Sequence, residues 1–133
     1  MRTLRISRRA DEDIVAALEL SLRRFGGSAS RRYEALIVEA LNGLCAEPAR
    51  IGSAPHPELG PGIRAYHLRF SREDARTAEG VVQRPRHIVV YRELDKGVLE
   101  VLRVLHDRMA PERHVLMQAD LEIPEDPSTG TSV

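Results

Sequence analysis

Residues 98–109, VLEVLRVLHDRM, decide how the fold of this chain is interpreted. The segment is apolar over its first eight residues apart from two embedded charges, and it ends abruptly at His106, Asp107 and Arg108. Its β-branched residues favour a strand over a short helix, and apolar residues on both faces indicate a central strand. The three polar residues therefore belong either to a working site or to a core strand where it reaches the surface.

A hairpin is predicted upstream of this strand. Residues 87–92 form a second apolar and β-branched run, and the loop 93–97 joins it to residues 98–105. Gly97 stands in that loop at a place where a positive φ is often needed. Residues 63–70 predict a further strand, in which Arg64 shares one face with apolar residues.

The N-terminal half of the chain predicts a strand and two helices. Residues 3–6 alternate between apolar and polar, as in a half-buried strand, and Ser7 is a candidate N-cap for the helix that follows. The Gly26–Gly27 pair ends that helix, and Ser28 is a candidate cap for a second one, which stops before Pro48. The expected order is thus strand, helix, helix, strand, strand, strand.

Two segments predict irregular structure. Residues 48–62 hold four prolines and three glycines, and residues 71–85 are polar, charged and without clear periodicity. We expect one domain over residues 1–119, followed by a flexible acidic tail at 120–133 that has too few apolar side chains to offset the entropy of ordering it.

Composition excludes several classes of protein. The chain is 42% apolar and 30% charged, lacks an apolar run long enough to cross a membrane, and begins without the apolar core of a signal peptide. A cytoplasmic location is therefore the expectation. The single Cys45 excludes an intramolecular disulfide and a cysteine-based zinc site. Nineteen of the 20 basic residues are arginine, whose planar fork suits carboxylate and phosphate partners, although biased genome composition explains the excess equally well.

The ordered set of segments resembles the RelE/ParE superfamily of toxins from type II toxin–antitoxin modules, with the ParE branch most similar. The resemblance rests on FGGSASRRYEALIVEALNGLCAEPARIG (25–52), on YHLRF (66–70) and on HIVVYRELDKGVLEVLRVLHDRM (87–109). It implies an α+β fold in which an antiparallel sheet packs against an N-terminal helical hairpin. It also implies a cognate antitoxin as partner and no cofactor, and it marks residues 71–85 as an inserted loop.

Within this superfamily, two functions share the fold. ParE-like members poison DNA gyrase, whereas RelE-like members cleave mRNA on the ribosome without a metal. Such a ribonuclease needs a proton shuttle and phosphate-stabilising cations, for which the candidates are His106, Arg64 and Arg108. The chain has one lysine and no tyrosine after its last strand, so it lacks the basic and tyrosine sets of those enzymes. The sequence therefore favours a plasmid-stabilisation toxin that binds a protein target, DNA gyrase, with mRNA cleavage as the alternative.

The hypothesis of a protein target leads to candidate residues for contact with that target. The expected target-binding residues are Arg64, Arg103 and Arg108. A strand that pairs antiparallel with residues 63–70 ends next to the start of 63–70. With the strand at 98–105 as that neighbour, Arg64 and Arg108 are expected at the same end of the sheet. In a strand His106 and Asp107 point to opposite faces, and only a turn at Asp107 would bring them together.

Other residues remain open to two interpretations. The expected antitoxin-binding residues are Arg23, Arg24, Arg31 and Arg32, at the turn of the helical hairpin. Arg64 has the alternative of a structural ion pair with Glu100 or Asp107. A metal site built from His67, His87, His106 and Asp107 is a further alternative without supporting spacing.

Overall fold

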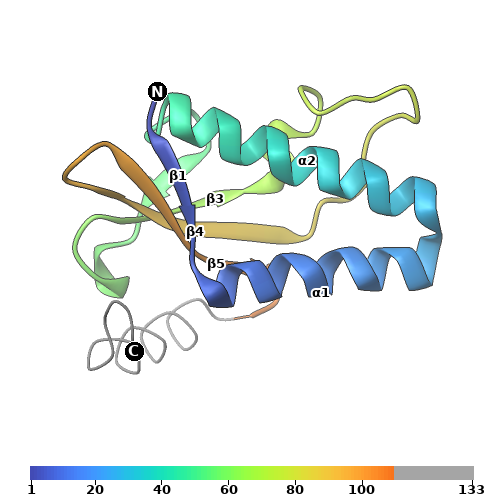
Figure 1. Ribbon diagram of the computed structural model, residues 1–133, viewed down its shortest axis with the longest axis horizontal. Helices are drawn as coiled ribbons and strands as arrows, with labels where there is room; N and C mark the ends of the chain where they lie inside the picture. The colour runs from blue at the N-terminus through green and yellow to red at the C-terminus, as the bar shows by residue number, and fades with distance from the viewer. Residues whose placement is uncertain (110–133) are drawn as a thin grey trace.

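The computed structural model describes residues 1–109, so the tail expected at 120–133 lies outside the described residues. The elements follow in this order: β1 (Thr3–Ile6), α1 (Arg8–Phe25), α2 (Gly27–Ala46), β2 (Ser53–Pro55), the 3-10 helix η1 (Pro57–Leu59), β3 (Ile63–His67), the 3-10 helix η2 (Leu68–Ser71), β4 (His87–Leu94) and β5 (Val98–His106). Figure 1 shows α1 and α2 as an antiparallel pair beside the sheet. The expected α+β class and N-terminal helical hairpin are confirmed.

The five described strands form one mixed sheet in the order β1-β5-β4-β3-β2. Four neighbouring strands, β2 to β5, pair antiparallel, whereas β1 pairs parallel with β5, from Thr3 opposite Val98 to Ile6 opposite Val101. The sheet is therefore not wholly antiparallel as expected. The alternation of residues 3–6 indicates which face of a strand is buried, but it carries no information on the direction of its neighbour.

Local interactions define the ends of the two helices. The Ser7 hydroxyl accepts a hydrogen bond from the Ala10 N–H at 3.0 Å, which confirms Ser7 as the N-cap of α1. Gly26 separates α1 from α2 with a φ of 94°, a conformation that glycine adopts without a Cβ penalty. The second helix begins at Gly27 rather than after Ser28, so the predicted cap at Ser28 is wrong. The Gly26 backbone closes one helix and opens the next, and it leaves no room for a separate cap.

Two apolar clusters cover the two faces of the sheet. The larger contains side chains from α1, α2 and the strands, among them Leu36, Leu44, Tyr91, Leu99 and Val101. The smaller, on the opposite face, is formed by Leu59, Ile63, Val90 and Leu105. A fully buried leucine contributes roughly 1.5–3 kcal/mol through its removal from water, so the larger cluster holds the helical hairpin on the sheet.

The loop expected at 48–62 is partly ordered. Within it, β2 pairs with β3 as an edge strand, where proline is tolerated at Pro55, and η1 follows. The strand expected at 63–70 ends earlier, at His67, because the chain turns there into η2. The Arg69 N–H donates to His67 Nδ1 at this turn, and Leu68 is buried.

Apart from Ser71, which ends η2, the loop expected at 71–85 contains no helix or regular strand, as predicted. Turns shape it, and Thr77 and Gly80 exchange backbone hydrogen bonds at its tip. Ala75 and Val82 pack against the larger apolar cluster, which ties the loop to the body of the domain. In the described part of the chain, neither helix is long and apolar enough to cross a membrane.

Candidate functional site

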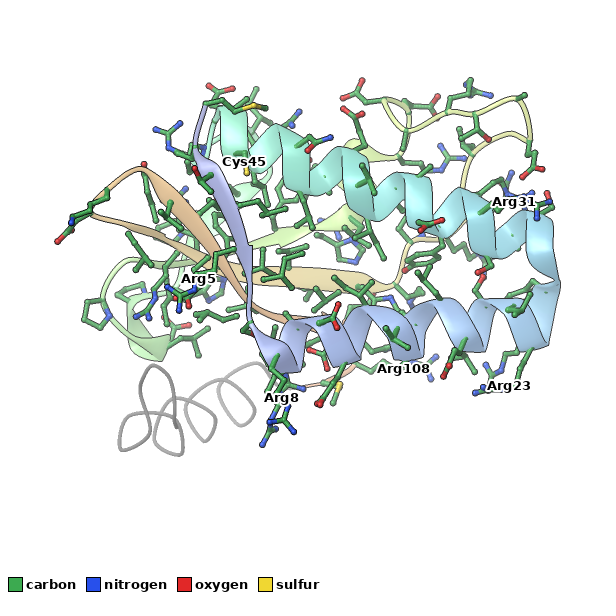
Figure 2. The ribbon with its side chains drawn as sticks, viewed as in Figure 1. Arg5, Arg8, Arg23, Arg31, Cys45 and Arg108 are labelled. Atoms are coloured by element: carbon green, nitrogen blue, oxygen red, sulfur yellow. The ribbon has the colours of Figure 1, made fainter. Side chains whose placement is uncertain are left out.

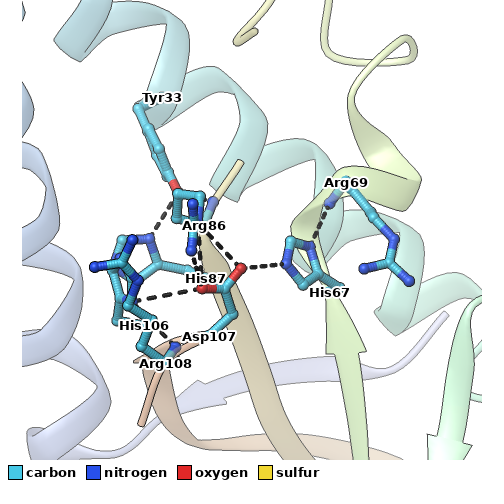
Figure 3. Close-up of polar contacts among 8 residues, drawn as sticks. All are labelled: Tyr33, His67, Arg69, Arg86, His87, His106, Asp107 and Arg108. Carbon is cyan, nitrogen blue, oxygen red and sulfur yellow. Dashed lines mark hydrogen bonds and ion pairs between the residues drawn. The ribbon is translucent and has the colours of Figure 1, made fainter. Parts of the chain in front are cut away.

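Three adjacent strands bring polar side chains to one end of the sheet. There β3 ends at His67, β4 begins at His87 and β5 ends at His106, and the register sets His67 opposite Ile88 and His87 opposite His106. Since neighbouring strands lie about 4.8 Å apart, imidazoles from all three strands gather within two strand spacings. Figure 3 shows these imidazoles with the polar residues around them, and we call the whole group the histidine end: Tyr33, His67, Arg69, Arg86, His87, His106, Asp107 and Arg108.

A turn directly after β5 places Asp107 at the centre of the histidine end. Its N–H donates to the Arg86 carbonyl at 2.7 Å. Its carboxylate accepts from Arg86 Nη2 at 2.9 Å and from His67 Nε2 at 3.1 Å. The Arg86 hydrogen bond, helped by that of His67, lowers the pKa of Asp107 to about 2, and the same pair raises the pKa of Arg86. Asp107 is thus a fixed anion at neutral pH and a poor proton acceptor.

Tyr33 of α2 reaches the same end and binds His87. Its hydroxyl accepts the Arg86 N–H at 3.0 Å and lies 2.6 Å from His87 Nδ1, so it donates its own proton to that nitrogen. Burial raises the pKa of Tyr33 to about 12. Burial, followed by the nearby His106, lowers the pKa of His87 to about 4. Both groups are neutral at pH 7, and they form a fixed structural hydrogen bond.

Backbone contacts define the tautomers of the other two imidazoles. The N–H of Arg69 donates to His67 Nδ1 at 3.0 Å, and the N–H of Arg108 donates to His106 Nδ1 at 3.1 Å. In the neutral rings the proton therefore lies on Nε2, from which His67 donates to Asp107. His106 Nδ1 also lies 3.5 Å from Asp107 Oδ1, but it presents a lone pair there, so this contact is not a hydrogen bond while the ring is neutral.

The turn at Asp107 brings His106 and Asp107 together, which a continued strand would have prevented. The four residues of the metal alternative, His67, His87, His106 and Asp107, do lie near one another. Both ring nitrogens of His67, and Nδ1 of His87 and of His106, are nevertheless engaged by backbone N–H groups, by the Tyr33 hydroxyl or by Asp107 itself. Within residues 1–109 no group of three or more histidine, cysteine or acidic side chains is arranged to hold a metal.

Arg64 lies at the opposite end of the sheet, so it does not meet Arg108. Both β3 and β5 pair antiparallel with β4, which lies between them, so they run in the same direction and begin at the same end of the sheet. Arg64 Nε donates to Ser53 Oγ at 2.7 Å, and Tyr91 links Ser53 to the Pro48 carbonyl. Arg64 and Tyr91 line a hollow of about 440 Å³ walled by Pro48, Pro55 and Pro57. Neither Glu100 nor Asp107 is the partner of Arg64.

The carboxylates near Arg64 are paired with other arginines. Glu100 lies 2.8 Å from Arg92 Nε and 3.8 Å from Arg5 Nε, and Glu93 pairs with Arg2 at the sheet edge. We call this region, with Arg92, Glu93 and Glu100 at its centre, the glutamate end. Each of these two carboxylates has at least one arginine partner from another part of the sheet or its flank.

Arg103 is buried, with 8% of its surface exposed, whereas the target-binding prediction needs it on the surface. Its Nε and Nη2 donate to the two carboxylate oxygens of Asp13 in α1 at 2.7 and 3.0 Å, and Asp13 also accepts from the Val104 N–H at 2.9 Å. Arg103 thus fastens α1 to β5, and this geometry excludes it as a contact for a target in the folded state.

The four arginines of the hairpin turn divide into two pairs. Arg23 and Arg24 are exposed at the end of α1. Arg31 binds both carboxylate oxygens of Glu79, with Nη2 at 3.0 Å, and Arg32 Nη1 donates to the Glu79 carbonyl oxygen at 3.3 Å. Arg23 and Arg31 lie at the same end of the hairpin in Figure 2. An antitoxin that binds Arg31 must therefore displace Glu79, whereas Arg23 and Arg24 carry no such intramolecular pair among the described residues.

The sequence interpretation did not identify Tyr33 or Arg86 as part of a polar site. Tyr33 follows the apolar repeat of α2 and is indistinguishable there from a core residue. Arg86 precedes β4 within a loop rich in charge. The one available signal was the occurrence of histidine at the ends of two predicted strands, His87 and His106, with His67 inside a third, and the topology brings all three to one end of the sheet.

Comparison with known proteins gives matches of two kinds, to a family model and to solved structures. A family model described as "ParE toxin of type II toxin-antitoxin system, parDE" matches residues 4–111. A solved structure described as "Chromosomal ParDE TA system from P. aeruginosa" aligns with a TM-score of 0.55 and 21% identity, covering 80% of this chain and 96% of that one. At this identity the second match supports the fold alone. A search of curated proteins found no match. Because the family model spans most of the sequence, this chain belongs to the ParE toxin family of type II toxin–antitoxin systems.

Proposed function

We propose that this protein is a plasmid-stabilisation toxin that stops growth in the cytoplasm by binding DNA gyrase and is neutralised by a cognate antitoxin. The family match over residues 4–111 carries this proposal. Three groups of the histidine end are poorly matched to proton transfer, because an efficient general acid or base has a pKa near the working pH. The pKa of Asp107 is about 2, that of His87 about 4 and that of Tyr33 about 12.

The deciding experiment adds the purified protein to two reactions in parallel. In a supercoiling reaction we expect inhibition of gyrase, and with translating ribosomes we expect intact mRNA. Cleaved mRNA together with unaffected gyrase would overturn the proposal. The antitoxin part is tested separately, since it concerns a different surface.

Cleavage of mRNA on the ribosome is the second candidate, and one observation favours it. His106 and Arg108 lie together at an exposed end of the sheet, where a nucleic acid has access. Arg64, the third member of the candidate set, is at the other end and cannot join them. This reading therefore depends on His106 as the proton shuttle.

A growth assay in cells without the antitoxin separates these two functions at residue level. We expect Arg108→Ala to abolish killing, because it removes an exposed cation from the target-binding surface, and His106→Ala to remain toxic. Arg23→Ala at the hairpin turn serves as the matched arginine control and should also remain toxic. The opposite ranking, with His106→Ala inactive and Arg108→Ala toxic, would favour the ribonuclease.

The arginines at the hairpin turn are the proposed contact for antitoxin carboxylates. Charge reversal of Arg23 and Arg24 should weaken the complex more than reversal of Arg31 and Arg32, because Glu79 already occupies Arg31. Titration calorimetry with the cognate antitoxin at low salt measures this difference. Unchanged affinity in both double variants would remove the electrostatic part of the antitoxin proposal.

A further inference from the structure

We infer that the histidine end is a binding surface for the phosphodiester backbone of nucleic acid. This goes beyond the proposed gyrase target and does not depend on it, and it shares His106 and Arg108 with the ribonuclease alternative but requires no cleavage. The inference begins with topology. Arg69 follows the end of β3, Arg86 precedes β4 and Arg108 follows the end of β5, so three adjacent strands each present one arginine at the same end of the sheet. At about 4.8 Å per strand, this row spans roughly 10 Å.

The charge of this row is not cancelled. Asp107 is the carboxylate that Figure 3 shows among these residues, and Arg86 already neutralises it through two nitrogens. Arg69 and Arg108 lie on either side of that pair, and neither guanidinium has a carboxylate partner within residues 1–109. A net positive charge therefore remains at the surface, which attracts a polyanion over a distance of about one Debye length.

Neighbouring groups suit a phosphodiester in particular. The Arg69 guanidinium lies 4.7 Å from the centre of the Phe70 ring, which restrains it, and the Phe70 side chain is itself partly exposed. Arginine next to an accessible aromatic ring is the combination that single-stranded nucleic acid uses for phosphate pairing and base stacking. His106 adds an Nε2–H donor on the other side of the row, with its tautomer fixed by the Arg108 N–H.

The test measures binding of fluorescein-labelled 12-mers of single-stranded DNA and of RNA by fluorescence anisotropy at several salt concentrations. Replacing one phosphate-contacting arginine should lower the magnitude of the slope of log K against log salt by about 0.7, the value for one contact to a single strand. We expect Arg69→Ala and Arg108→Ala each to show this loss, and Arg23→Ala, at the far end of the hairpin, to show none. Comparing the affinities for the DNA and the RNA 12-mer shows which of the two nucleic acids the surface binds more tightly.

Matched controls keep the result interpretable. Arg69→Lys and Arg108→Lys retain the charge and should retain the slope, so an equal loss in the Ala and Lys variants would show that the charge does not set the slope and would count against the inference. Poly-glutamate of equal charge is the competitor. If it displaces the oligonucleotide as well as unlabelled DNA does, the surface recognises acidic protein segments and the inference fails. Equal slopes for the Arg23, Arg69 and Arg108 alanine variants would also overturn it, while leaving the gyrase proposal untouched.

Discussion

The two ends of the sheet hold similar residue types but differ in how charge is arranged. At the glutamate end, Arg92 and Arg5 share Glu100, and Arg2 pairs with Glu93. At the histidine end, one carboxylate, Asp107, lies among cations and imidazoles. In the first arrangement each of these three arginines has a carboxylate partner, and the pairs tie strands of the sheet together. The second leaves positive charge facing solvent.

The difference separates stabilising arginines from arginines that are available to a partner. An exposed ion pair contributes little to folding, about 0–1 kcal/mol, but it occupies the guanidinium and reduces its attraction for another anion. In a chain with 19 arginines, the number of arginines is therefore a poor guide to a binding surface. The distribution of carboxylates identifies the surface, because it decides which arginines stay unpaired.

The largest effect is expected on loss of Asp13, whose buried pair with Arg103 lies close to the histidine end. Asp13→Ala leaves Arg103 buried without its partner, and we expect the free energy of unfolding to fall by roughly 3–5 kcal/mol. Urea denaturation measures the loss. The double variant Asp13→Ala with Arg103→Met should recover a large part of it, since it removes the unpaired charge. A loss below 1 kcal/mol in the single variant would show that water reaches Arg103.

A smaller effect, with a distinct pH dependence, is expected for Asp107→Asn. The pKa of Asp107 in the folded protein, about 2, lies below its usual value near 3.9, so the ionised carboxylate stabilises the fold above about pH 4. This contribution, about 1–2 kcal/mol after allowance for partial exposure, disappears as the pH falls through 2. Urea denaturation of both proteins at pH 7 and at pH 2.5 should show a difference that shrinks at the lower pH. A constant difference would assign the effect to packing.

The smallest effect is expected at the glutamate end. Glu100→Gln removes the carboxylate shared by Arg92 and Arg5, but both arginines keep access to water, so we expect a loss of about 0.5–1 kcal/mol. Thermal unfolding in low salt and in 0.5 M salt tests this, because screening should reduce the difference by about half or more. A loss larger than that of Asp107→Asn would reverse the proposed contrast between the two ends.

The fold was predictable where local pattern determines structure. The strands at 87–92 and 98–105, the two helices and the Ser7 cap follow from periodicity and capping chemistry, and each is present with small shifts in its ends. The parallel pairing of β1 and the edge strand β2 were not predictable. Both depend on which segment lies alongside another across the sheet, and alternation within a single strand does not encode this.

The location of the candidate site in the sheet was predictable from the sequence, but the partners of its side chains were not. The sequence marked His106, Asp107 and Arg108 as a polar end of a core strand, and the structure has them at one end of the sheet. It misplaced Arg64 because the direction of β3 relative to β5 depends on the number of hairpins between them. It also treated Arg103 as available, since an arginine in an apolar run gives no sign of a partner that lies 90 residues away.

The parallel pairing of β1 with β5 has a consequence for how the protein is made. Thr3 is opposite Val98, and the helical hairpin is fastened to the sheet through Arg103, so the N-terminal half lacks its main partners until β5 has been synthesised. At about 5–20 residues per second, translation of the intervening hundred residues takes roughly 5–20 s. During that interval the nascent chain has neither the complete five-stranded sheet nor the histidine end, which forms in one late step as β5 leaves the ribosome.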